Sequence, residues 1–260
     1  MTIFHSIILG LVEGITEFLP VSSTGHLILA NSLLHITESD FTKSFDIIIQ
    51  LGAILAVIVL YWKKIWNWRM IKLLIVGFVP TGIIGLALYK VVKSYLLGNE
   101  SIVLWSLLIG GIVLIVFELW HGKTGREERA TVQDVQNISY TQAATVGLFQ
   151  ALAIIPGVSR SAATIIGGMS LGIARTTIVE FSFLLAVPTM LAASGLDLVK
   201  NASLFSMDQF AVLAIGFVVS FVVAWGAIKF LLDFVRKHTF IPFGIYRIAV
   251  AIVFWLAIVR

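Results

Sequence analysis

The sequence has no cysteine and few charged residues. Without thiols it can form neither disulfides nor thiolate metal sites. Only 12% of the 260 residues are charged, against roughly 25% in soluble domains. Hydrophobic residues make up 59%, and the mean hydropathy is +1.02. The composition therefore indicates an integral membrane protein, which we expect to form a single membrane domain over residues 1–260.

Two other signals are also missing. No soluble segment carries clustered basic residues with interleaved aromatics, so we expect membrane lipids, and no nucleic acid, as partners. The apolar start of the chain lacks a basic flank and has Glu13 and Glu17 where a signal peptide would have its apolar core. We therefore do not interpret it as a cleaved leader.

Six segments are long and apolar enough to cross a membrane, which takes about 20 residues. They are 45–62, 71–92, 102–120, 178–199, 210–233 and 241–259. Two further apolar stretches are interrupted by proline: 3–18 and 23–34 flank Pro20, and 141–154 and 158–171 flank Pro156. Each piece is too short to cross alone. We therefore predict two re-entrant helix hairpins, whose breaks must be buried in protein or line a watery cavity.

The two halves of the chain resemble each other. Gly10-Leu11 recurs at 147–148 and Val21-Ser22 at 158–159, both at an offset of 137. We predict repeats over 1–120 and 138–260, joined by a polar linker, 121–137. Each repeat has one hairpin and three spans. Because three spans end on the opposite side of the membrane, the second copy is inserted upside down. The expected fold is an all-α polytopic membrane protein with an inverted-topology repeat and a site between the copies.

Basic residues predict the orientation of this topology. Twelve of the 18 Lys and Arg residues fall on one side, which the positive-inside rule makes cytoplasmic. They are Lys63, Lys64, Arg69, Lys72, Lys123, Arg126, Arg129, Arg175, Lys229, Arg236, Lys237 and Arg247. The mouth of the first hairpin then opens to the extracytoplasmic side. Glu118 falls at a cytoplasmic helix end, where we expect it to be solvated.

Two carboxylates lie in the first hairpin. Glu13 and Glu17 are four residues apart and share a helix face. In a low dielectric they cannot both stay charged without a shared proton or a cation. A divalent ion such as Mg²⁺ or Ca²⁺ could bind them, and no organic cofactor is indicated. The alternative is a polar contact that holds helices together.

A new helix is expected to begin after Pro20, with Ser22 or Ser23 as its N-cap. The free N–H groups and positive dipole end of such a helix suit phosphate, and Thr24 lies in its first turn. Ser23 and His26 share a face, as a nucleophile and an acid or base would. The simpler alternatives are a plain cap and a buried, hydrogen-bonded histidine.

The second hairpin repeats this geometry with different chemistry. Arg160 at membrane depth needs an anion, which could be phosphate or the carboxylate of Glu13 or Glu17. Gln150 stands at the position of Glu13, so the acid/base groups belong to one copy and the arginine to the other. Other candidate binding residues are Gly157, Ser159, Ser161, Thr164 and, on the first long span, Gln50. Gln50 could equally be a polar end of that span.

The stretches EGITEFLPVSSTGH (13–26) and PGVSRSAAT (156–164) resemble the two signature motifs of the bacterial undecaprenyl-diphosphate phosphatases, the bacitracin-resistance family. The resemblance covers essentially the whole chain. It implies an enzyme of the bacterial inner membrane that hydrolyses the lipid diphosphate to undecaprenyl phosphate and inorganic phosphate. Such an enzyme recycles the carrier for peptidoglycan synthesis and confers bacitracin resistance.

The resemblance also implies roles for individual residues. Ser23 is the expected nucleophile, Glu17 and His26 its acid/base partners, Glu13 the second acid and Arg160 the phosphate ligand. His26 or water as nucleophile remains open, and so does a homodimer. The acid-phosphatase-like lipid phosphatases are excluded, since the chain lacks their Lys-x6-Arg-Pro motif. An inverted-repeat transporter or lipid flippase would have the same fold and is the alternative function.

Overall fold

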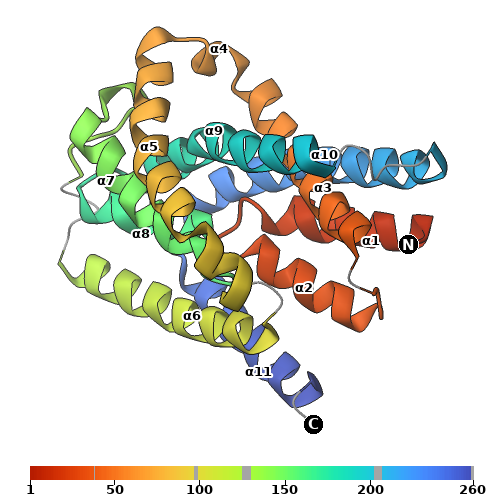
Figure 1. Cartoon of the computed structure of the whole chain (residues 1–260). Coiled ribbons are helices and arrows are strands. Elements are labelled where there is room, and N and C mark those ends of the chain that lie inside the picture. The colour runs from red at the N-terminus through yellow and green to blue at the C-terminus, as the bar shows by residue number, and fades with distance from the viewer. Residues whose placement is uncertain (38, 97–98, 125–129, 202–206, 259–260) are drawn as a thin grey trace.

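A computed structural model describes residues 1–37, 39–96, 99–124, 130–201 and 207–258. Over these residues it contains helices and no strands, with one isolated bridge between Val132 and Ile173 (Figure 1). The longer helices are α1 (Ile3–Thr16), α2 (Ser23–Leu33), α3 (Asp40–Leu60), α5 (Trp68–Val91), α6 (Glu100–Lys123), α7 (Tyr140–Ala151), α8 (Arg160–Ser170), α9 (Arg175–Asn201), α10 (Met207–Val235) and α11 (Ile241–Ile258). The all-helical prediction is confirmed.

Five helices are long and apolar enough to span a membrane, so the chain is a multi-pass membrane protein. Their apolar stretches are Phe41–Leu60, Trp68–Leu88, Glu100–Lys123, Arg175–Gly195 and Gln209–Val235. The segment predicted as a sixth span forms α11, whose described apolar stretch, Ile241–Leu256, is shorter. At 1.5 Å per residue it covers roughly 24 Å, less than the ~30 Å of a hydrocarbon core.

Lipid-facing surfaces account for the many exposed apolar side chains. Leu86 on α5 is 74% exposed and Val116 on α6 is 59% exposed. Near one end of the spans, Trp62, Trp66 and Trp68 are also exposed, as aromatic residues at a membrane interface are. The exposed apolar surface of these helices thus agrees with burial in a bilayer.

Both predicted helix breaks are present. α1 ends at Thr16 before Pro20, and α7 ends at Ala151 and continues as a 3₁₀ turn, Leu152–Ile154, before Pro156. Each is followed by a helix of 11 residues, α2 or α8. The residue that caps each new helix has a left-handed backbone, with φ of 75° at Ser22 and 76° at Ser159. This conformation costs a non-glycine residue about 1–2 kcal/mol.

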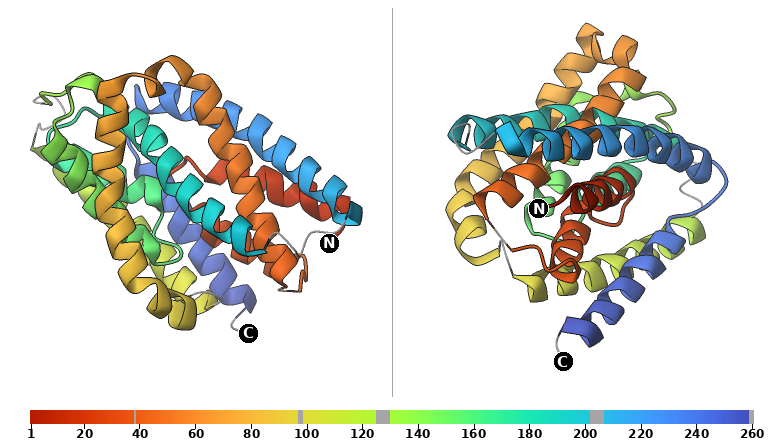
Figure 2. Two further views of the ribbon diagram at one scale, coloured as in Figure 1. Left: turned by 45° about the horizontal axis from the view of Figure 1, so that its top comes forward. Right: turned by 90° about the vertical axis from the view of Figure 1, so that its right-hand side faces the viewer.

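The broken helices pack against helices from the other half of the chain. α1 lies along α10 and α7 lies along α5 (Figure 2). Glycines allow a close approach of the backbones: a Cβ on Gly10 would be 2.9 Å from the Gly216 carbonyl oxygen, and one on Gly147 would be 1.9 Å from that of Gly77. Small residues at helix contacts are typical of membrane proteins.

Glu118 on α6 is buried, so the expectation that it is solvated was wrong. Its carboxylate accepts hydrogen bonds from both Nη atoms of Arg175 and, at 2.8 Å, from the backbone N–H of Phe240. Both donors lie far from Glu118 in the sequence. Together they satisfy its buried carboxylate without water.

The predicted linker, 121–137, is only partly a free polar segment. α6 continues to Lys123, and Arg126 and Arg129 lie outside the described residues. Further on, Val132 and Val135 are buried, and the N–H of Ala174 donates to the Val132 carbonyl at 3.0 Å. The end of the linker therefore packs against the segment that leads into α9.

Candidate active site

A cavity of about 310 Å³ lies where the two helix breaks meet. Eight of the predicted site residues line it: Glu17, Ser22, Ser23, Thr24, Gln50, Gly157, Ser159 and Arg160. Its other lining residues, which the sequence did not single out for the site, are Thr81, Gln150, Ala153, Ile154, Pro156, Thr189, Met190 and Ala193. The cavity thus joins polar groups of both hairpins to an apolar wall.

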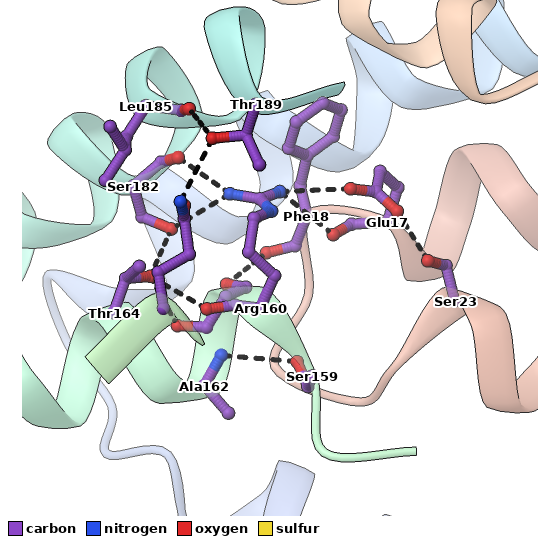
Figure 3. Close-up of polar contacts among 12 residues, drawn as sticks. Glu17, Phe18, Ser23, Ser159, Arg160, Ala162, Thr164, Ser182, Leu185 and Thr189 are labelled. Carbon is purple, nitrogen blue, oxygen red and sulfur yellow. Dashed lines mark hydrogen bonds and ion pairs between the residues drawn. The ribbon is translucent and has the colours of Figure 1, made fainter. Parts of the chain in front are cut away.

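Glu17 connects the serine of one hairpin to the arginine of the other (Figure 3). The Ser23 hydroxyl donates a short hydrogen bond to Glu17 Oε2. Arg160 Nη2 donates to Glu17 Oε1 at 3.1 Å, so the ion pair that the sequence left open as an alternative to phosphate is present, with Glu17 as the partner. A carboxylate that accepts the serine proton's hydrogen bond is placed to remove that proton, so Glu17 can act as the base for Ser23.

Arg160 is held by the second half of the protein and keeps one donor free. Its Nη1 donates to the carbonyl of Ser182 at 2.7 Å and to the Ser182 hydroxyl at 3.2 Å. Its buried Nε has no partner among the described residues. Guanidinium groups bind phosphate through several N–H groups, so Arg160 can hold a phosphoryl group beside Ser23.

Two helix N-termini converge on the cavity. The Ser22 hydroxyl accepts from the N–H of Gly25 at 3.4 Å, and the Ser159 hydroxyl accepts from Ala162 at 3.2 Å. Ser22, rather than Ser23, is therefore the cap of α2, which leaves the Ser23 hydroxyl available for chemistry. Both positive dipole ends, together with Arg160, favour a multiply charged anion in this space.

Glu13 lies behind the cavity wall, one helical turn from Glu17. It is completely buried, and neither carboxylate oxygen has a hydrogen-bond partner among the described residues. A buried carboxylate without a partner is costly unless it is protonated or binds a cation.

His26 is held away from Ser23. Its Nδ1 lies 2.8 Å from the Ser22 carbonyl oxygen, and a carbonyl can only accept, so Nδ1 carries the proton. Its Nε2 then accepts from the Tyr246 hydroxyl at 2.9 Å, and the two rings stack 5.5 Å apart. His26 does not line the cavity, so in this conformation Glu17 alone is bonded to the serine.

Two other predicted binding residues have internal partners. The Ser161 hydroxyl donates to the Phe18 carbonyl at 2.8 Å, which ties α8 to the first break. The Thr164 hydroxyl lies 2.7 Å from that of Ser182, the residue that holds Arg160. Neither lines the cavity. The structure brings them close to the site as supports of its backbone and of Arg160.

Comparison with known proteins agrees with this geometry. The sequence model of the family "Bacitracin resistance protein BacA" matches residues 6–253. The chain belongs to this family. It is 48% identical over 256 residues to a protein named undecaprenyl-diphosphatase from Sulfurihydrogenibium sp., covering 98% of this chain and 99% of that one. A protein of the same name from Wolinella succinogenes is 50% identical over 255 residues, covering 98% and 97%.

Arg247 on α11 is the main residue of this BacA-family site that sequence reasoning missed. We had placed it among the cytoplasmic basic residues, and this was wrong, because it is completely buried between the two breaks. Its guanidinium donates to five backbone carbonyls, at 2.9–3.4 Å. They are those of Pro20 in the first break, Gly157 and Val158 in the second, and Ser106 and Leu107 on α6. Arg247 therefore joins the two breaks that form the cavity.

The carboxylates of Glu13 and Glu17 are the candidate ligands for a divalent ion. Among the described residues no three His, Asp or Glu side chains cluster. Both oxygens of Glu17 are engaged, whereas neither oxygen of Glu13 has a partner among the described residues. Mg²⁺ commonly binds one or two carboxylates and completes its shell with substrate phosphates and water. Glu13 and Glu17 would hold such an ion, which would neutralise charge on the diphosphate.

Proposed function

We propose that this chain hydrolyses undecaprenyl diphosphate to undecaprenyl phosphate and inorganic phosphate. The observation that carries the proposal is the chain of contacts from Ser23 through Glu17 to Arg160, in a cavity between two helix N-termini. The names of its relatives support the same substrate, and the multi-pass fold suits a lipid. The reaction would return the carrier for envelope synthesis and, by removing the diphosphate that bacitracin sequesters, confer resistance.

In the proposed first step, the Ser23 oxygen attacks the terminal phosphorus. Its proton passes to Glu17, the bond from phosphorus to the bridging oxygen breaks, and undecaprenyl phosphate leaves. Arg160 and the two helix N-termini stabilise the charge of the phosphoryl group during transfer. The apolar side chains of Ile154 and Met190 offer the start of the prenyl chain a dry path out of the cavity.

An inverted repeat is the topology we propose for this fold. It is supported by the contacts Gly10–Gly216 and Gly147–Gly77, because Gly10 aligns with Gly147 and Gly77-Phe78-Val79 recurs as Gly216-Phe217-Val218. The matching left-handed caps, Ser22 and Ser159, support two re-entrant hairpins. With most basic residues on the cytoplasmic side, the cavity would open to the extracytoplasmic side of the inner membrane.

The test of the activity is phosphate release by the purified protein from a farnesyl or undecaprenyl diphosphate. We expect turnover by the natural chain and none by Ser23→Ala. Absence of release above background from the natural chain would instead favour a transporter of the same fold. Mapping of single cysteines introduced into loops would test the orientation independently, since the chain has none of its own.

A further inference from the structure

Gln150 lines the cavity but has no role in the step proposed above. Its side chain is 1% exposed. The amide nitrogen donates to the Thr81 hydroxyl at 2.9 Å and to the Thr189 hydroxyl at 3.0 Å. The amide oxygen, Oε1, is buried and has no partner among the described residues. Gln150 thus has one acceptor without a partner, in a side chain that lines the cavity.

The two threonines fix which end of the amide is the oxygen. The Thr81 hydroxyl donates its only proton to the Gly147 carbonyl at 2.7 Å, and the Thr189 hydroxyl donates to the Leu185 carbonyl at 2.8 Å. Both oxygens can therefore only accept from Gln150, and the nitrogen must face them. The amide cannot rotate without losing two hydrogen bonds, so Oε1 is held ready for a donor.

Few components of the reaction can supply that donor. The terminal phosphate is largely deprotonated at neutral pH, and a prenyl chain has no polar hydrogen. A divalent ion would bind at the charged oxygens of Glu13 and Glu17 in the first hairpin. Water can donate, it fits a polar cavity wall, and hydrolysis consumes it. We propose that Gln150 binds the water that hydrolyses the phosphoserine formed at Ser23.

The position of Gln150 suits this role. In a phosphoryl transfer the attacking and leaving oxygens lie on opposite sides of phosphorus. Figure 3 shows Ser23, the leaving group of the second step, beyond Glu17 from Arg160, and Thr189, the partner of Gln150, next to the Arg160 guanidinium and away from Ser23. A phosphoryl group bound by Arg160 would therefore present its free face to Gln150.

The step balances without another reactant. The water oxygen attacks phosphorus while the bond from phosphorus to the Ser23 oxygen breaks. Ser23 recovers from Glu17 the proton that it gave up in the first step. Both water protons stay on the phosphate, one of them shifting to a phosphoryl oxygen, and dihydrogen phosphate leaves. Gln150 supplies only position, by accepting a hydrogen bond from the water.

This inference rests on the proposed function, and a single experiment separates the two. Polyprenyl diphosphate labelled in its terminal phosphate is mixed with enzyme, quenched in acid and analysed for labelled Ser23 and free phosphate. Gln150→Leu keeps the size of the side chain and removes the acceptor. We expect its phosphate release to fall about 100-fold, the scale of a misplaced reactant, while label on Ser23 rises toward one per enzyme.

A merely structural role for Gln150 would give a different result. Both steps would slow together and no label would accumulate, which would overturn the inference. Thr189→Val, which removes one of the two anchors of the amide, should give the same accumulation to a smaller extent, and Thr189→Ser should restore the natural pattern. Thr189→Val also keeps the test decisive where Gln150→Leu fails to fold.

Failure of the proposed function has its own signature. If Ser23→Ala releases phosphate at the natural rate and no variant carries label on Ser23, the covalent mechanism is wrong. If the natural chain carries a trapped label that Gln150→Leu does not raise, the mechanism stands and the water site is wrong.

Discussion

The two hairpins have one backbone design and two chemistries. α2 and α8 have the same length, and each begins after a left-handed serine. At the first residue of the new helix, one hairpin has Ser23 and the other has Arg160. One turn before the break, the first has Glu17 where the second has Ile154, and Glu13 corresponds to Gln150. In the proposed repeat, the nucleophile would therefore come from one copy and the anion-binding group from the other.

Removal of the nucleophile should have the largest effect on this division of labour. We expect Ser23→Ala to lower phosphate release by about 10⁴-fold or more, since loss of a covalent nucleophile removes the first step. Steady-state assays in detergent measure it, and unchanged binding of a non-hydrolysable diphosphate analogue controls for folding. A loss below tenfold would refute the assignment of the nucleophile to the first hairpin.

Removal of the arginine tests the other half. Arg160→Ala should lower turnover by about 10³-fold, as loss of a charge-stabilising arginine does in phosphoryl transfer. Arg160→Lys should recover only part of it, because an ammonium group cannot bond Glu17, Ser182 and a phosphate in one plane. Equal activity of the lysine variant and the natural chain would mean that the fork geometry of Arg160 is not used.

Arg247 tests whether the two hairpins must be held together. Arg247→Met leaves the carbonyls of both breaks without their donor and should cost about 2–4 kcal/mol of stability, together with most of the activity. Gly110→Ala is a matched variant that leaves the arginine in the sequence, since a Cβ there would lie 2.0 Å from Arg247 Nη2. We expect both the Tm and the turnover to fall in each variant. A normal Tm and normal turnover in both would show that Arg247 is not needed to hold the two breaks together.

The smallest effect should come from the partner of His26. Tyr246→Phe removes one partly exposed hydrogen bond, worth about 0.5–1.5 kcal/mol, and should lower turnover by about 2- to 10-fold. Turnover of this variant, measured beside that of Ser23→Ala, compares the contribution of His26 with that of Ser23. A loss as large as that of Ser23→Ala would place His26 in the chemical step and break the assignment of Glu17 as sole base.

Much of the site was predictable from local sequence. Pro20 and Pro156 interrupt apolar stretches, and helix capping after them predicts two N-termini at depth. Residues adjacent to these breaks therefore entered the cavity as expected. Local patterns could not predict the position of Arg247, which is 227 residues from one of its acceptors. Its partners are backbone carbonyls, which have no sequence signature, so a count of basic residues misplaced it.

Gln150 is a different kind of omission. The proposed repeat aligns Gln150 with Glu13, and this correspondence was a usable signal for the site. The sequence could not show its two hydrogen-bond partners, Thr81 and Thr189. They come from α5 and α9 and come together only in the folded protein. Glu118 is similar, because its pairing with Arg175 depends on contacts between distant helices.

The exchange of helix contacts between the halves bears on the origin of this architecture. α1 packs on α10 and α7 packs on α5, so the first helix of each broken pair contacts the opposite half. If the halves arose by duplication, a half-length ancestor would have lacked these contacts and could have made them only in a pair of identical chains inserted in opposite directions. In such a pair every site residue would occur twice, and a fusion of the two genes would allow each copy to specialise.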